Sequence, residues 1–188
     1  MTAIVGVLLA AGAGRRFGPD KLLHPLPGGE PIGIAAARNL VAAVPDAVAV
    51  VRPGDRALAD ALSAIGLRVV ENPRANAGMG TSLAAGIHSR PDAEGWVIAL
   101  ADMPWIRPAT IATVAQALCD GASLAAPLHG GRRGHPVGFG ARWRPALLAL
   151  SGDAGARDLL AAHAAELSLL PTDDPGVLRD VDETEDLR

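Results

Sequence analysis

The sequence lacks the features that mark several broad classes of protein. It has one cysteine, Cys119, so a disulfide within the chain is excluded. This cysteine ends an alanine-rich helical stretch, which predicts a small buried side chain. The 17 basic and 20 acidic residues leave a net charge of -3 and form no basic stripe. We therefore expect no nucleic-acid partner and only local phosphate contacts.

No apolar segment has the length of a membrane span. The apolar stretch at residues 4–11 is far shorter than the roughly 20 residues that a spanning helix requires. No basic segment precedes it, as one would in an export signal. These absences predict a cytoplasmic protein without a membrane partner.

The order of the apolar segments indicates the fold class. The 188 residues, 49% of them hydrophobic, suffice for one compact domain spanning residues 1–188. We expect strands at residues 4–9, 47–51, 68–71, 96–100, 123–127 and 167–170, and helices at residues 32–44, 55–65, 80–89, 108–118, 143–150 and 156–165. Residues 128–139 interrupt the alternation and suggest a hairpin with an antiparallel strand. This order predicts an α/β three-layer sandwich with a mostly parallel, Rossmann-like sheet, whose ligands bind beyond the carboxyl ends of the strands.

A glycine-rich loop follows the first strand. Residues 12–21 contain three glycines, two arginines and Lys21, a composition that lets backbone N–H groups and cationic side chains surround an anion. The dinucleotide-binding pattern fails because Phe17 stands where its third glycine is required, and the second strand ends at Arg52 rather than at an acidic residue that holds a ribose. A P-loop fails because Leu22 follows Lys21 where serine or threonine is needed. Both common nucleotide-binding folds are disfavoured.

The loop resembles a signature of nucleotidyltransferases with the sugar-nucleotide-pyrophosphorylase fold. That signature is Leu-x-x-Gly-x-Gly-x-Arg-Met-Gly followed by a lysine, and here Phe17 replaces the methionine. The resemblance implies that the backbone at the start of the loop contacts the nucleobase. This backbone comprises Leu9, Ala10, Ala11 and Gly12. It implies that Gly14 and Arg15 lie along the phosphates and that Lys21 stabilises the α-phosphate under attack.

Two acidic segments carry the expected metal ligands. Asp102 follows the strand at residues 96–100, in an Asp-x-Pro context that resembles the family's metal-binding aspartate. A carboxylate there suits Mg²⁺, which takes one or two carboxylates together with phosphate oxygens and water. Residues 180–187 are similar to the family's Asp-Ile-Asp-Thr-Pro-Glu-Asp-Leu segment, which implies Asp182 as a second ligand and Asp180 as its rival. Without the resemblance, Asp102 reads as a helix cap or turn residue and the acidic end as a solvated tail.

Later motifs resemble the branch of the family that makes the cytosine dinucleotide form of molybdenum cofactor. Residues 78–86 open a helix whose N-terminus can face a base, ribose or phosphate, with Gly78 and Ser82 as the implied nucleotide contacts and simple capping as the alternative. The motifs at residues 134–137 and 152–157 resemble the acceptor-side elements of that branch. They imply contacts with molybdopterin from Gly134, His135, Pro136, Asp153 and Arg157.

The resemblance runs from residue 4 to residue 187 and implies a reaction. It identifies a Mg²⁺-dependent enzyme that transfers CMP from CTP to molybdopterin and releases pyrophosphate, with Lys21, Arg15 and Asp102 as catalytic residues. The implied partners are these small molecules and a molybdenum hydroxylase that receives the finished cofactor. The alternatives are transfer from GTP, transfer to a sugar or alcohol phosphate, and a carrier or insertion chaperone for the cofactor. A nicotinamide-dependent oxidoreductase has only the α/β alternation in its favour.

Overall fold

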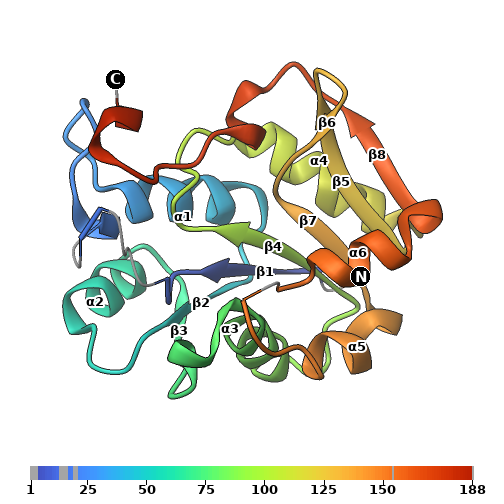
Figure 1. Ribbon diagram of the computed structural model, residues 1–188, viewed down its shortest axis with the longest axis horizontal. Coiled ribbons are helices and arrows are strands. Elements are labelled where there is room, and N and C mark those ends of the chain that lie inside the picture. Colours follow the sequence, from blue (N-terminus) through green and yellow to red (C-terminus); the bar gives the residue numbers. More distant parts are fainter. Residues whose placement is uncertain (1–3, 13–16, 19–20, 154, 188) are drawn as a thin grey trace.

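The computed structural model describes residues 4–12, 17–18, 21–153 and 155–187, and Figure 1 shows their arrangement. Within these residues eight strands form one sheet, in the order β3-β2-β1-β4-β7-β5-β6, with β8 paired to β5. The strands are β1 (Ile4–Leu9), β2 (Ala47–Val51), β3 (Arg68–Glu71), β4 (Gly95–Leu100), β5 (Leu124–His129), β6 (Arg132–Arg133), β7 (Val137–Gly140) and β8 (Leu167–Pro171).

Helices cover both faces of this sheet. One layer holds α1 (Ile32–Ala43), α2 (Arg56–Ala64) and α4 (Pro108–Cys119), and the opposite layer holds α3 (Met79–His88), α5 (Arg144–Leu148) and α6 (Arg157–Ala162). The expected α/β three-layer sandwich with a mostly parallel sheet is therefore confirmed.

The burial of the central strands explains the two helical layers. Alternate side chains of a strand point to opposite faces, so Val5 and Val7 pack against α3 while Leu8 packs in the layer of α1. Every residue of β2 is buried as well. Strands that are apolar on both faces require cover on both faces, and this favours helices on either side.

The strand directions place the site. β3, β2, β1 and β4 run parallel to one another, so their carboxyl ends share one edge of the sheet. β7 runs antiparallel to both β4 and β5, and β6 is antiparallel to β5. The expected hairpin with an antiparallel strand is thus present, and the parallel half of the sheet ends at β4.

Several predictions from the sequence need correction, on the burial of one residue and on the ends of two helices. Cys119 is exposed, not buried, because α4 turns Ile111, Val114 and Leu118 towards the core and its last residue away from it. The helices expected at residues 143–150 and 156–165 are shorter, and a 3-10 turn at Ala164–Glu166 separates α6 from β8. In the part of the chain that the structure describes, no helix is long and apolar enough to cross a bilayer.

The segment after β8 returns to the carboxyl edge of the sheet and is not a solvated tail along its whole length. Val177 and Val181 are fully buried. The buried carboxylate of Asp174 accepts hydrogen bonds from the backbone N–H of Arg107 and the hydroxyl of Thr110, and so ties this segment to the start of α4. These contacts fix the path of the chain towards the end of β4 (Figure 1).

Candidate active site

Three segments far apart in the sequence meet beyond the carboxyl end of β4. The ammonium of Lys21 lies 2.8 Å from Asp102 Oδ2 and 3.7 Å from Asp182 Oδ1. Lys21 is 8% exposed, although it carries a charge. A buried ammonium requires opposite charge nearby, and these two aspartates supply it. The structure therefore brings together Lys21, which is expected to stabilise the α-phosphate, and the two aspartates that are expected to bind the metal.

Backbone contacts hold Asp182 in this group. The N–H of Val181 donates to the carbonyl of Asp102 at 2.9 Å, which pins the chain one residue before Asp182. The carboxylate of Asp186 then accepts the N–H groups of Asp182 and Glu183, both at 2.8 Å. These bonds lower the pKa of Asp186, and they close the turn at Glu183 and Thr184.

Asp180 lies in the same acidic group. Loss of solvent around its carboxyl group, together with the negative charges of Asp182 and Asp102, raises the pKa of Asp180. The ion pair to Lys21 favours Asp182 as the second carboxylate, and it leaves Asp180 a neighbour that adds negative charge.

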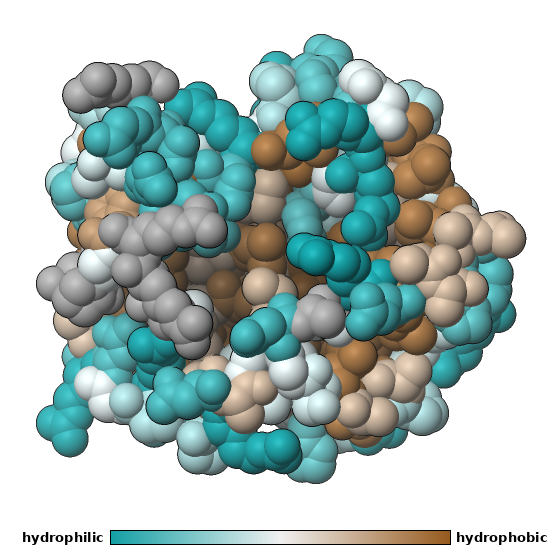
Figure 2. All heavy atoms as spheres, viewed as in Figure 1, coloured by the Kyte–Doolittle hydropathy of each residue, from teal (hydrophilic) through white to brown (hydrophobic). Residues whose placement is uncertain are grey.

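A cleft of about 490 Å³ opens beside this group. It is lined by the strand-end residues expected to meet a nucleotide and by residues of the opposing loops, namely Leu9, Ala11, Gly12, Arg52, Ala75, Asn76, Gly78, Met79, Ser82, Leu100, Asp102 and Asp153. We call it the larger cavity. Ala10 is buried at the strand end, where its N–H bonds to Val50. Figure 2 shows a hollow with hydrophobic residues on its floor and hydrophilic residues on its rim.

The wall formed by α3 is held by a buried asparagine. Asn72 is 3% exposed, and its amide donates to the hydroxyls of Thr81 and Ser82, both at 3.0 Å. Because Ser82 accepts this bond, its own O–H remains available to donate. The bond thus orients the hydroxyl that Ser82 presents to the larger cavity.

The start of α3 lies against the loop that carries Asp153. The N–H of Gly80 donates to the carbonyl of Gly152 at 2.9 Å, and the N–H of Gly152 donates to Ala77 at 3.1 Å. Gly78 has a φ of +104°, and a Cβ there would lie 2.2 Å from the carbonyl carbon of Gly152. Only glycine fits that approach, and the contact brings Asp153 to both cavities.

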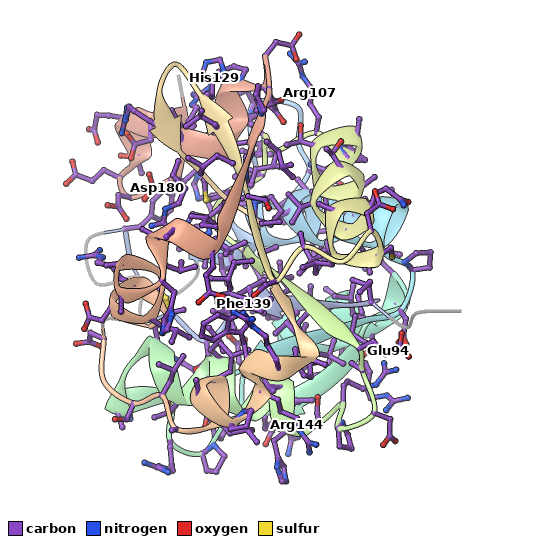
Figure 3. The ribbon with its side chains drawn as sticks, turned by 90° about the vertical axis from the view of Figure 1, so that its right-hand side faces the viewer. Glu94, Arg107, His129, Phe139, Arg144 and Asp180 are labelled. Carbon is purple, nitrogen blue, oxygen red and sulfur yellow. The ribbon has the colours of Figure 1, made fainter. Side chains whose placement is uncertain are left out.

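A second cavity of about 240 Å³ adjoins the first and shares Leu9, Met79, Leu100 and Asp153 with it. We call it the smaller cavity. Its wall is largely apolar and includes Phe139, which lies in the centre of Figure 3. Two cations also line it, Arg133 and Arg157, together with His135. This combination suits a flat, partly apolar ligand that bears an anionic group.

His135 enters the smaller cavity as a neutral ring. Burial, and secondly the nearby charge of Arg133, lower the pKa of His135 to about 4. Its Nδ1 atom is buried without a hydrogen-bond partner among the described residues. A buried polar atom without a partner is costly unless a ligand or water satisfies it.

The remaining predicted residues fall in three groups. Asp153 and Arg157 line the smaller cavity with His135. Gly134 and Pro136 are not among the lining residues, and Gly134 packs so closely on Val177 that a Cβ would lie 2.5 Å from its carbonyl oxygen. Gly14 and Arg15, predicted to lie along the phosphates, are outside the described residues.

Sequence reasoning missed several residues of this site. Arg52 and Asn72 each follow a parallel strand. The rule that predicted Asp102, a position just beyond the carboxyl end of such a strand, therefore applies to them as well. Arg133 belongs to the short strand β6, and Phe139 lies within the apolar strand β7, where nothing in the sequence separates it from core residues.

The residues present fit a metal ion that arrives with a nucleotide. Asp102 and Asp182 offer two carboxylates, and the described residues hold no group of three or more potential ligands from His, Cys, Asp and Glu. Mg²⁺ is commonly held by one or two carboxylates, while phosphate oxygens and water complete its octahedron. A two-carboxylate site without a full protein cage matches that requirement.

Comparison with known proteins finds relatives over almost the whole chain. Nicotine blue oxidoreductase from Paenarthrobacter nicotinovorans is 31% identical over 201 residues, which cover 100% of this chain and 96% of that protein. The manganese complex of Rv0371c from Mycobacterium tuberculosis has a TM-score of 0.80 at 27% identity, with 98% and 96% of the two chains covered. A nucleotidyl transferase from Methanothermobacter has a TM-score of 0.84 at 25% identity, with 99% and 94% covered.

The family model that describes the MobA-like NTP transferase domain matches residues 6–167. This range contains the loop after β1, Asp102 and the motifs that are expected to bind the acceptor. The chain belongs to the family of MobA-like NTP transferase domains and is a nucleotidyltransferase.

Proposed function

We propose that this enzyme transfers CMP from CTP to molybdopterin, with Mg²⁺ bound to the nucleotide, and releases pyrophosphate. One observation carries the proposal: the two cavities adjoin at the carboxyl end of β4, where Leu100 lines both and Asp102 contacts Lys21. Two substrates bound in adjoining cavities meet at that point. A charged group at the junction acts on both.

The chain's own residues perform the transfer by alignment and electrostatics. An oxygen of the acceptor's phosphate attacks the α-phosphorus in line, the bond from that phosphorus to the β-phosphate oxygen breaks, and pyrophosphate leaves. A phosphate monoester has a second pKa of about 6, so it is already ionised near neutral pH and needs no general base. Lys21 stabilises the negative charge that spreads over the nonbridging oxygens.

Asp102 and Asp182 would hold the metal in this scheme. Mg²⁺, when bound there, supplies positive charge to the phosphates. We also assign Arg15, Gly14 and the backbone of residues 9–12 to the nucleotide, in agreement with the family resemblance.

The nature of the smaller cavity supports molybdopterin as the acceptor. A pterin is a flat ring system, for which the apolar wall around Phe139 offers contact area. Arg157 and Arg133 suit its phosphate, because guanidinium groups bind phosphate oxygens in pairs. The neutral His135 offers a hydrogen bond without adding a charge. The product would then pass to a molybdenum hydroxylase.

A thermal-shift panel tests the nucleotide. The protein is heated with Mg²⁺ and each of CTP, GTP, UTP and ATP, because a ligand at 100 times its Kd adds about 2.7 kcal/mol of stability. We expect the largest stabilisation with CTP, and its loss in Asp102→Ala.

Pyrophosphate release from CTP that requires molybdopterin then tests the acceptor. A GTP preference moves the donor to guanine, and stabilisation without turnover favours a carrier of the cofactor.

The identity to nicotine blue oxidoreductase supplies a second candidate, an oxidation-reduction reaction. Against it, the loop after β1 departs from the dinucleotide-binding spacing at Phe17, and β2 is followed by Arg52 instead of an acidic residue. Oxidation of NADH or NADPH in the presence of a quinone-type dye measures this activity directly. We expect none above the rate without enzyme.

A further inference from the structure

We infer that Arg52 is a specificity-determining residue, which selects nucleobases that present two adjacent hydrogen-bond acceptors. The inference rests on the proposed function, because it assigns a role within the same nucleotide site. Cytosine presents such a pair at O2 and N3, and guanine at O6 and N7. Uracil and adenine lack it, because the atom beside each candidate acceptor carries hydrogen.

The position of Arg52 suits contact with the base rather than with the phosphates. The sheet order is β2-β1-β4, so Arg52 at the end of β2 and Asp102 at the end of β4 lie on opposite sides of β1. Both line the larger cavity. When the α-phosphate lies at Asp102 and Lys21, the nucleoside extends along the cavity towards Arg52.

A hydrogen bond fixes the guanidinium in the cavity. Arg52 Nε donates to the carbonyl of Ala11 at 2.9 Å. Guanidinium has five N–H donors in one plane, so this bond orients the group and leaves the terminal nitrogens for a ligand. Arg52 makes no ion pair with an acidic residue in the described ranges. Its charge therefore remains available to a ligand.

The opposite wall of the cavity presents a donor as well. Ser82 accepts a hydrogen bond from Asn72, so its O–H is free to donate towards the cavity. Arg52 from β2 and Ser82 from α3 thus offer donors from two sides. A site of oriented donors favours a base edge with acceptors and leaves its own groups unpaired against the wrong base.

Competitive binding of matched nucleotides tests this role. Affinities for CTP and UTP, and for GTP and ATP, are measured by calorimetry with Mg²⁺ on the wild type, Arg52→Met and Arg52→Lys. Arg56→Met serves as the matched control, because Arg56 is an exposed arginine at the start of α2. We expect the wild type to bind CTP at least tenfold more tightly than UTP, or GTP at least tenfold more tightly than ATP. Arg52→Met should reduce this ratio of affinities to threefold or less.

The lysine variant separates fork geometry from charge. Lysine keeps the charge but loses the planar pair of donors, so we expect Arg52→Lys to lose the base preference while it keeps more affinity than Arg52→Met. An unchanged preference in Arg52→Met would overturn the inference and leave the proposed transfer intact. A wild-type preference for UTP or ATP would overturn the inference and would also contradict CTP as the proposed donor. A wild type that binds no nucleotide contradicts the proposed function, and the inference fails with it.

Discussion

The larger and the smaller cavity adjoin, yet they are built from different kinds of segment. The larger cavity is lined mainly by residues at or beyond the ends of parallel strands, such as Gly12, Arg52 and Asp102. The smaller one is lined by side chains within strands and on α6, such as Ile98, Phe139 and Leu160. The first depends on the parallel sheet itself, and the second on interior side chains. We expect the two to respond separately to substitution.

The largest effect is expected at Lys21. Lys21→Ala removes the ammonium that stabilises charge on the α-phosphate, and loss of one such group costs about 10²–10³-fold in turnover. Binding of CTP, measured by calorimetry, should change much less, since the base and ribose contacts remain. Unchanged turnover in this variant would contradict the role of Lys21.

A smaller effect, confined to the smaller cavity, is expected at Arg157. Arg157→Ala should raise the KM for molybdopterin by about tenfold, because a charge-assisted hydrogen bond contributes about 1.5–3 kcal/mol. The Kd for CTP should stay within twofold of the wild type, as it should in Arg56→Ala. An equal loss of CTP affinity would show that the two cavities do not act separately.

The smallest effect concerns stability at acid pH. Since the pKa of His135 in the fold is about 4 and that of a free histidine about 6.5, the unfolded chain takes up this proton first as pH falls. The buried neutral ring therefore does not lower the free energy of unfolding above pH 6.5. From pH 6.5 down to pH 4 it lowers that free energy progressively.

His135→Gln removes this titration. Between pH 6.5 and pH 4 its free energy of unfolding should fall less than that of the wild type, by on the order of 2 kcal/mol. Urea unfolding at several pH values measures the difference, and His88→Gln, on the exposed end of α3, provides the control. Parallel pH curves for wild type and His135→Gln would contradict the assigned pKa.

Much of the larger cavity could be predicted because its residues are marked by position. Leu9 ends, and Gly12 and Asp102 follow, apolar runs that alternate too little to be surface strands. The carboxyl ends of such strands meet at one edge. The same rule applies to Arg52, whose role was missed because the expected partner of a ribose is acidic. Position was informative, and residue type misled.

The smaller cavity and the last segment were harder to predict for a physical reason. Whether Phe139 lines a cavity or the core depends on which neighbours leave space beside it, and sequence periodicity carries no such information. The placement of Asp182 depends on the bond between Val181 and Asp102, a contact between residues 79 positions apart. For Cys119, helix periodicity was available, and the phase of α4 was misjudged.

The close contact between the start of α3 and the loop at Gly152 has a consequence for genetic variation. Every missense change at a glycine codon introduces a residue with a Cβ atom. At position 78 that atom would lie 2.2 Å from the backbone of Gly152, and at position 80 it would lie 2.8 Å from the backbone of Ser151. Any side chain at either position therefore forces the backbone of residues 151–153 to shift, and we expect a saturation library to return few substitutions at both codons among active clones.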